Sequence, residues 1–364
     1  MPWAKPIFFD REREYLADAL DSTWISGGPY VERFEKDFAK AIKTPFVITA
    51  SNGTTALLLA MLGLNINPGD EVIVPGFTFV APANMAIAIG ARPVFVDVDP
   101  LTWCIDPHEV QKAVTKKTKV ICAVHLYGNV CAMNELQAIC RKHKLILVED
   151  VAEAAFSKYK GRFAGTLSDA GTFSFQATKT ITMGEGGCVA VRDEKLAHRM
   201  RIIRSHGMNR EKFYWHTEIG HNFRLPNLQA AVGCAQLERA HKIIAQKKCV
   251  YKLYKKYLKN INGVTLQYIP KEVDAVVWAV AVKIDPKAFR GNRDQLMTKM
   301  LEVGIETRPG FYPFEVMPLY KPFVNKKSSI ARELGANVLS LPSFSQLTEE
   351  EIVFICQRLQ SLRK

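Results

Sequence analysis

Short apolar runs alternate with amphipathic, helix-like segments between about residues 45 and 192. The apolar runs are PFVITA (45–50), DEVIVP (70–75), ARPVFVDV (91–98), TKVICAVHL (118–126) and KLILVED (144–150). Strands that alternate with helices predict crossover units and a mainly parallel sheet. Uninterrupted apolar strands such as LILV suit a sheet that helices cover on both faces. The pattern therefore predicts a large α/β domain.

A long helical pattern, PNLQAAVGCAQLERAHKII (226–244), leads out of this region. Beyond it, GVTLQYI (263–269) and AVVWAVAVKI (275–284) are typical of strands, while GNRDQLMTKMLEVG (291–304) and EEEIVFICQRLQSLRK (349–364) are typical of helices. A chain of 364 residues is long enough for two domains. We expect a large domain over 1–245, with an N-terminal segment, and a smaller C-terminal α+β domain over 246–364.

The composition is that of a soluble globular protein, with 48% hydrophobic and 23% charged residues. No apolar run reaches the roughly 18 residues of a membrane span, and MPWAKPIFFDRERE lacks the apolar core of a secretion signal. The eight cysteines form no CxxC pair, which predicts reduced thiols; neither a disulfide framework nor a zinc site is indicated. We expect a cytoplasmic protein without a metal.

The formal net charge of +13 predicts an anionic partner. Nucleic acid is one candidate, because phosphates dominate its binding by proteins. The densest lysine runs are KKTK (116–119) and KCVYKLYKKYLK (248–259), and the second has apolar residues at helical spacing, as a solvated helix face has. No helix-turn-helix or RNA-binding signature accompanies them. A phosphate-bearing small molecule is therefore favoured over nucleic acid.

Ligands of parallel α/β sheets bind beyond the carboxyl ends of the strands, and two candidate features are expected there. Asp150 ends KLILVED, where it is either a helix N-cap or a carboxylate opposite a pyridinium nitrogen. The turn ASNGTTAL (50–57) joins a strand to a helix through Gly53 and Thr54. It is either an ordinary turn or a phosphate site at a helix N-terminus.

Lys179 stands in FSFQATKTITMGEGG (173–187), between an alternating Phe-Ser-Phe and a glycine cluster. Lysines are mostly solvated surface groups, but a desolvated amine forms a Schiff base with a carbonyl cofactor. In PGFTFVAPAN (75–84), Phe77 or Phe79 is either a core residue or a cover for a flat ring. The order of these features along the chain favours the cofactor hypothesis.

In this order the motifs resemble those of the pyridoxal-phosphate-dependent aminotransferases that act on nucleotide-linked keto-sugars (DegT/DnrJ/EryC1/StrS type). The resemblance covers nearly the whole chain. Its motifs are TWISGGPYVERFE, NGTTAL, PGFTF, VHLYG, VEDVAEA, FSFQATKTITMGEGG, GHNFRLPNLQAA and ETRPGFYPFEVMP. It implies the aspartate-aminotransferase fold (fold type I), with pyridoxal 5′-phosphate as the cofactor and a homodimer with shared active sites.

The resemblance also implies a role for each cofactor residue. Lys179 would be the Schiff-base lysine, and Asp150 would pair with the pyridinium nitrogen. The remaining cofactor residues would be Glu153 near the ring hydroxyl, Phe79 stacked on the ring, and Gly53, Thr54 and Ser174 around the phosphate. Asn222 of GHNFR would reach the phosphate of the neighbouring subunit. The glycines of GEGG would let the chain after Lys179 pass close to the cofactor.

Three further residues are expected near the substrates. Arg224 and Arg308 would lie near the charges of a dicarboxylate donor and a nucleotide-sugar, although Arg308 also suits a structural ion pair. Relatives often carry histidine in a Phe-His-Pro sequence where this chain has Tyr312 in FYP, a departure that bears on the sugar and not on the cofactor.

Within the family, TWIS and YWHTEIGHNFR look most like enzymes that aminate carbon 4 of a 4-keto-6-deoxyhexose, such as perosamine and viosamine synthases. We expect glutamate to be the donor and GDP-4-keto-6-deoxymannose to be converted to GDP-perosamine, an O-antigen (lipopolysaccharide) type of sugar. The alternatives are the dTDP-linked 4-keto-6-deoxyglucose and a regulatory binding protein of the same fold. Lys179 argues against a third, a sugar dehydratase, because dehydratases of this fold have histidine there.

Overall fold

The protein is described by a computed structural model over residues 1–209, 212, 214–324 and 328–364. Within these residues, its central sheet has seven strands. Their order across the sheet is β1 (Phe46–Ala50), β9 (Gly187–Val191), β8 (Ala170–Ser174), β5 (Ile146–Asp150), β4 (Thr118–Val124), β2 (Glu71–Pro75) and β3 (Arg92–Val96). Strand β9 runs antiparallel to β1 and β8, and the other neighbouring pairs are parallel. The predicted α/β class with a mainly parallel sheet is confirmed.

Alternate residues of the inner strands point into different cores. On β2, Ile73 packs into one cluster, and Val72 and Val74 pack into another. On β4, Ile121 and Cys122 divide between the same two clusters. Because successive side chains of a strand face opposite sides of the sheet, a sheet covered on both faces needs apolar residues at every position. That requirement explains the uninterrupted apolar runs in the sequence.

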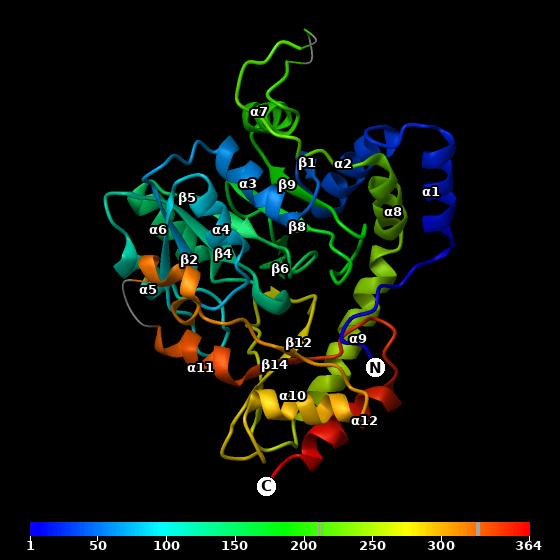
Figure 1. The fold of residues 1–364 in the computed structure, drawn as a ribbon, viewed down its shortest axis with the longest axis vertical. Coiled ribbons are helices and arrows are strands. Elements are labelled where there is room, and N and C mark those ends of the chain that lie inside the picture. Colours follow the sequence, from blue (N-terminus) through cyan, green and yellow to red (C-terminus); the bar gives the residue numbers. More distant parts are fainter. Residues whose placement is uncertain (210–211, 213, 325–327) are drawn as a thin grey trace.

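Helices follow the strands in the order that the sequence predicts. The helices of the large domain are α1 (Asp10–Asp21), α2 (Pro29–Ile42), α3 (Gly53–Gly63), α4 (Ala81–Ala88), α5 (Pro107–Ala113), α6 (Met133–His143), α7 (Glu194–Arg204) and α8 (Asn227–Glu238), with a short 3-10 turn, η1 (Leu126–Gly128). Helices α1, α2 and α8 gather on one side of the molecule, and α9 (Ala240–Leu258) leads from them toward the C-terminal part (Figure 1).

The helical pattern over 226–244 belongs to two helices, where the sequence predicts one. Helix α8 ends at Glu238, and Arg239 leaves the helical region with φ −101° and ψ 2° before α9 begins. Cys234 of α8 packs in the core of the large domain, whereas Tyr254 of α9 packs in a second core. After the break, α9 runs from the first core, where Ala240 and Ile243 pack, into the second, and the hydrophobic period continues across the break.

The second core lies against an antiparallel sheet in the C-terminal part. Its strands, in spatial order, are β10 (Val264–Leu266), β12 (Val280–Ile284), β14 (Val338–Leu341) and β13 (Arg308–Pro309). Helices α10 (Arg293–Glu302), α11 (Ser329–Asn337) and α12 (Glu349–Ser361) and the 3-10 turns η2 (Phe314–Val316) and η3 (Pro318–Phe323) complete this part. The proposed division after residue 245 falls within α9 and stays a prediction.

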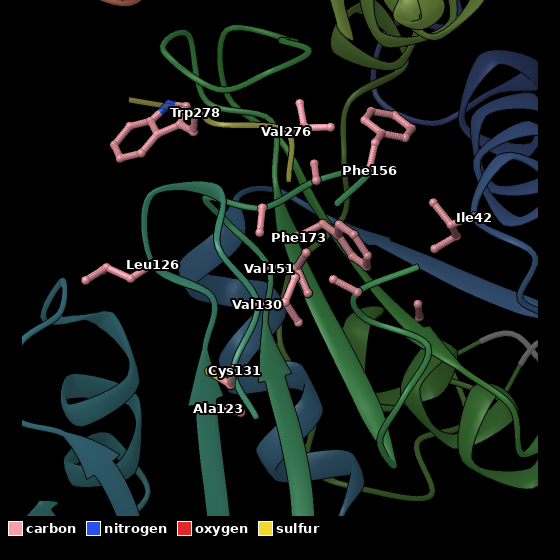
Figure 2. Packing of buried hydrophobic residues seen from close by; sticks show 14 of the residues in the cluster. Ile42, Ala123, Leu126, Val130, Cys131, Val151, Phe156, Phe173, Val276 and Trp278 are labelled. Atoms are coloured by element: carbon pink, nitrogen blue, oxygen red, sulfur yellow. The ribbon is translucent and has the colours of Figure 1, made fainter. Parts of the chain in front are cut away.

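The strand predicted over 275–284 begins only at Val280. The five residues before it carry Val276 and Trp278, which pack into the core of the large domain. Figure 2 shows these two side chains among others of the same cluster, including Phe156 and Leu126, which come from that domain. A small sheet of β6 (Lys158–Tyr159), β7 (Arg162–Phe163) and β11 (Val273–Asp274) ties the two parts together just upstream. Residues 275–279 are apolar because they bridge two cores.

Three smaller features of the sequence are the cysteines, the lysine run on α9 and the length of the apolar helices. All eight cysteines are free thiols, and only Cys249 is exposed. On α9, Lys252, Lys255 and Lys256 are exposed while Val250 and Tyr254 are buried, so the lysine run is a solvated helix face as predicted. None of the helices in the described ranges is both long and apolar enough to cross a membrane.

Candidate active site

A cavity of about 840 Å³ lies where β4, β5 and β8 end. It is lined by eight of the residues that the sequence analysis selected, and they come from five separate stretches of chain. These residues are Gly53, Thr54, Phe79, Asp150, Glu153, Ser174, Lys179 and Arg308. Parallel strands present their carboxyl ends at one edge of a sheet, which is why residues so distant in sequence share one cavity.

The start of α3 forms one end of the cavity. Asn52 caps this helix, because its side chain accepts a hydrogen bond from the amide of Thr55 at 2.9 Å. The amides of Gly53 and Thr54 belong to the first turn, where a helix offers no internal acceptor. The hydroxyl of Ser174 faces the same place from the end of β8. Free amides at a helix N-terminus beside a hydroxyl suit a phosphate group.

Two glycines allow this close approach. A Cβ on Gly53 would lie 2.7 Å from the Cβ of Ser174, and a Cβ on Gly187 would lie 2.4 Å from the backbone of Asn52. Any larger residue at either position would separate the turn from β8 and β9. Gly187, the last glycine of GEGG, therefore makes room for the turn itself. This refines the expectation that the GEGG segment passes close to a cofactor.

Two buried carboxyl groups face the middle of the cavity. Asp150 accepts a hydrogen bond from the amide of Ala152 at 3.0 Å, and Glu153 accepts one from the amide of Tyr127 at 2.9 Å. Burial raises the pKa of Asp150, against the opposing effects of the Ala152 amide, Lys179 and His125. Burial also raises the pKa of Glu153 to about 7. A buried carboxylate needs a cationic or N–H partner to stay ionised, and a protonated ring nitrogen opposite Asp150 would meet that need.

Lys179 is only partly accessible, and it is reached from the cavity. Enclosure by the surrounding protein lowers the pKa of its amine, while Glu153 and Asp150 act in the opposite direction. Its Nζ lies 3.8 Å from the centroid of the Trp278 ring. The sequence left two interpretations of this lysine, and the structure agrees with the enclosed amine and not with the solvated surface group. A lysine whose pKa is lowered is a better nucleophile at neutral pH.

Aromatic side chains line another wall of the cavity, and the sequence analysis left all of them except Phe79 unassigned. Tyr127 stacks on Phe311 with ring centroids 5.6 Å apart, and Trp3 meets Trp278 edge-on at 5.5 Å. Phe79 is 54% exposed and contacts Phe311 edge-on at 6.1 Å. Tyr127 and Phe311 lie within the VHLYG and FYP motifs, so these motifs were the sequence signal that could have identified them as site residues. Trp3 and Trp278 belong to segments with no such signal.

The structure keeps Tyr312 outside the cavity. Its hydroxyl accepts a hydrogen bond from Arg293 at 3.3 Å, and the guanidinium of Arg293 lies over its ring at 5.3 Å. Arg308, by contrast, lines the cavity and also forms an ion pair with Glu306. Arg308 therefore forms the structural ion pair that the sequence suggested, and its role toward a substrate stays a prediction.

Asn222 and Arg224 also lie outside the cavity of their own chain. Both are exposed, and Arg224 donates a hydrogen bond to the Asn222 side chain at 3.0 Å. Arg224 borders a second cavity of about 710 Å³ next to Gly28 and Arg201. Between the two residues, the carbonyl of Phe223 accepts a hydrogen bond from the amide of Ser51 at 2.8 Å. The segment is thus fixed against the outer side of the phosphate-type turn, with its polar side chains directed elsewhere.

The cavity fits the cofactor that the resemblance implies. It offers an anion site at the start of α3, a carboxylate at Asp150 for a ring nitrogen, an exposed aromatic ring at Phe79 and an enclosed amine at Lys179. Its volume lies within the range of about 300–1,000 Å³ that small-molecule sites in proteins have.

Comparison with known proteins gives consistent matches along the chain. The DegT/DnrJ/EryC1/StrS aminotransferase family matches residues 7–360. The chain is 41% identical over 361 residues to the GDP-perosamine synthase of Escherichia coli O157:H7, covering 99% of this chain and 97% of the relative. It is 40% identical over 351 residues to the GDP-perosamine synthase of Caulobacter vibrioides, covering 96% of this chain and 94% of that relative.

Solved structures give the same fold. The GDP-4-keto-6-deoxy-D-mannose-3-dehydratase of Escherichia coli with bound hydrated pyridoxal phosphate superimposes with a TM-score of 0.93 at 27% identity, covering 98% of each chain. A histidine-to-asparagine variant of GDP-4-keto-6-deoxymannose-3-dehydratase with bound GDP-perosamine also gives a TM-score of 0.93 at 27% identity, with 98% of this chain and 99% of that one covered.

Proposed function

The chain belongs to the DegT/DnrJ/EryC1/StrS aminotransferase family and is a sugar aminotransferase with pyridoxal phosphate as its cofactor, and from this premise we propose its reaction. It transfers the amino group of glutamate to carbon 4 of GDP-4-keto-6-deoxymannose and so forms GDP-perosamine. The observation that carries the transamination chemistry is the enclosed amine of Lys179 in one cavity with Asp150 and the start of α3. The choice of sugar rests on the two GDP-perosamine synthases that match nearly the whole chain.

When bound, pyridoxal phosphate supplies an aldehyde carbon that takes up the amino group and a ring that accepts the electron pair of a broken C–H bond. We propose that Asp150 holds the ring nitrogen protonated, so that the ring can accept that pair. Glu153 lies three residues further along, in the turn after β5, and would face the ring hydroxyl. The amides of Gly53 and Thr54 and the hydroxyl of Ser174 hold the phosphate, and Phe79 covers one face of the ring.

Lys179 has two tasks in this proposal. Its amine holds the cofactor between turnovers, and once displaced it carries a proton from one carbon to the other. Both tasks need an amine that loses its proton more readily than a solvated lysine does, and enclosure, which lowers the pKa of Lys179, acts in that direction. Arg308, at the cavity, supplies positive charge for the anionic groups of glutamate or of the nucleotide.

We also propose a cytoplasmic homodimer in which Asn222 and Arg224 complete the site of the partner subunit. Asn222 and Arg224 both lie outside the cavity of their own chain. Two large apolar side chains in the segment just before them are exposed, Trp215 (54%) and Ile219 (89%). Exposed apolar side chains that gather in this way mark contact surfaces between proteins. A second copy of the chain is the partner that would bury them.

Mixed dimers test the shared site. Asn222→Ala and Lys179→Ala are each expected to be poor enzymes alone. After subunit exchange between equal amounts of the two, random pairing should restore about a quarter of the wild-type sites, because half of the dimers are mixed and one of their two sites is intact. The measurement is product formation before and after exchange, with each variant exchanged against itself as the control. Absence of recovery, with exchange demonstrated by mass, would mean that the site lies within one chain.

The reaction itself is tested in two half-reactions. Glutamate alone should convert the cofactor to its amine form, which changes the absorption spectrum, and GDP-4-keto-6-deoxymannose should then restore the original spectrum with formation of GDP-perosamine. The product is identified by mass against a panel that includes dTDP-4-keto-6-deoxyglucose. An unchanged spectrum with glutamate would exclude that donor. An amine form that reacts only with a 3-keto sugar would exclude the assignment to carbon 4.

A further inference from the structure

The ring of Trp278 lies against the amine of Lys179, and it is held from several directions. Its indole Nε1 donates a hydrogen bond to the carbonyl of Thr178 at 2.7 Å, and its amide donates one to the carbonyl of Tyr127 at 3.1 Å. The ring of Trp3 packs edge-on against it at 5.5 Å. Trp278 is 8% exposed. The indole therefore presents a fixed face to the cavity.

A buried lysine holds the backbone of this tryptophan. Lys247 of α9 donates hydrogen bonds from Nζ to the carbonyl of Trp278 and to the carbonyl of Ser343, both at 2.7 Å. It occupies a position of the apolar face of α9, between Ile243 and Val250. Burial lowers its pKa to about 7, and the charge of Lys179 acts in the same direction. A lysine is costly at such a position unless its amine is hydrogen-bonded, so these two carbonyls explain its place there.

The free amine of Lys179 lies over the indole face. The distance of 3.8 Å from Nζ to the ring centroid is well inside the roughly 6 Å over which an aromatic ring attracts a cation, and tryptophan attracts cations best. A lysine chain has four flexible bonds, and fixing it costs conformational entropy. An aminotransferase lysine is free during half of each cycle, so a defined resting place shortens its return to the reacting carbon.

We propose that Trp278 is a positioning residue whose indole face holds the free amine of Lys179 during the part of the cycle when that amine is not bonded to the cofactor. The proposal rests on the role of Lys179 in the proposed function, but not on the identity of the sugar or of the donor. The ring favours the ammonium form of Lys179, and enclosure favours the neutral amine. Trp278 thereby offsets part of the fall in the pKa of Lys179 that enclosure causes, and it keeps the amine able to take up a proton.

The charged and titratable groups around this amine are known from the structure. Asp150 ends β5 and Glu153 follows it, and both raise the pKa of Lys179. Lys247 approaches from α9. The other titratable groups that line the cavities next to Lys179 are Lys5, Tyr127, Glu185 and Arg308. Substitution of Trp278 changes none of these groups, so a shift in the pKa of Lys179 reports the loss of the ring face.

The test measures the pKa of Lys179 in enzyme loaded directly with pyridoxamine 5′-phosphate, in which the lysine is free without any donor or sugar. Each sample is acetylated with a trace of acetic anhydride between pH 6 and 10. The Lys179 peptide is quantified by mass spectrometry against the peptide of Lys299, an exposed lysine on α10. In Trp278→Leu the pKa of Lys179 should fall by about one unit, which corresponds to up to about tenfold faster acetylation near pH 7.5.

Trp278→Phe is the matched variant, because it keeps an aromatic face and loses only the indole N–H and part of the ring. Phenylalanine attracts cations less strongly than tryptophan, so the pKa of Lys179 should fall in the same direction by a smaller amount. This variant decides the question alone if the leucine variant does not fold. A pKa of Lys179 that is unchanged or raised in both variants, or equally lowered in both, would overturn the proposal. Because the cofactor is added directly as pyridoxamine 5′-phosphate, a wrong assignment of the donor or of the sugar leaves this result unaffected.

Discussion

Replacement of Lys179 by alanine is expected to abolish turnover, with a loss in kcat of at least about ten-thousandfold. The reason is that one amine serves both as the nucleophile that holds the cofactor and as the group that moves the proton, and proton transfer alone contributes about a hundredfold to ten-thousandfold. The measurement is GDP-perosamine formation from glutamate and GDP-4-keto-6-deoxymannose. Thermal unfolding of the variant checks that the fold is kept.

Lys179→Arg serves as the matched control for this prediction. It keeps a positive charge and a long side chain, but a guanidinium stays protonated and cannot act as a nucleophile, so it is expected to be as inactive as the alanine variant. Borohydride reduction of the wild-type enzyme followed by peptide mapping should attach the cofactor to Lys179. Attachment at another lysine, or substantial activity in Lys179→Arg, would contradict the assignment.

Asp150→Asn is expected to lower kcat by about a hundredfold to several thousandfold. The substitution keeps the shape of the side chain and an oxygen that can accept the Ala152 hydrogen bond, but it removes the charge opposite the ring nitrogen. Loss of one partner from a buried ion pair costs about 3–5 kcal/mol, and each 1.36 kcal/mol is about a factor of ten in rate. The half-reaction with glutamate, followed by absorption, measures the effect directly.

A second aspartate at the other end of β5 provides the control. Asp169 is exposed and accepts a hydrogen bond from the amide of Leu147 at 2.8 Å. Asp169→Asn removes a carboxylate near the same strand, far from the cavity, and should leave the half-reaction near its wild-type rate. Neither substitution touches the proposed phosphate contacts, and the absorption of the bound cofactor checks that both variants are loaded. Equal rates for Asp150→Asn and the wild type would remove Asp150 from the proposed mechanism.

The sequence alone determined the features that depend on local pattern and on chain order. Apolar runs fixed the strands from Phe46–Ala50 to Ile146–Asp150 within a residue or two at each end. Because parallel strands end at one edge, the strand pattern was enough to place Asp150 and the turn at Gly53 together, and the resemblance added Ser174 and Lys179, which line the same cavity. The family resemblance added the chemistry of the cofactor, which no hydrophobic pattern carries.

The tertiary structure decided what depends on contacts between distant segments. The break at Arg239 and the late start of β12 leave the hydrophobic pattern unchanged, because residues on either side stay buried: Ala235 and Ala240 both pack in the first core, and Trp278 and Val280 divide between the two cores. Trp278 reaches Lys179 from about a hundred residues further along the chain, and Lys247 looks like one more residue of a lysine-rich helix. Such neighbours depend on the path of the folded chain, whereas local periodicity reports only which face of an element is buried.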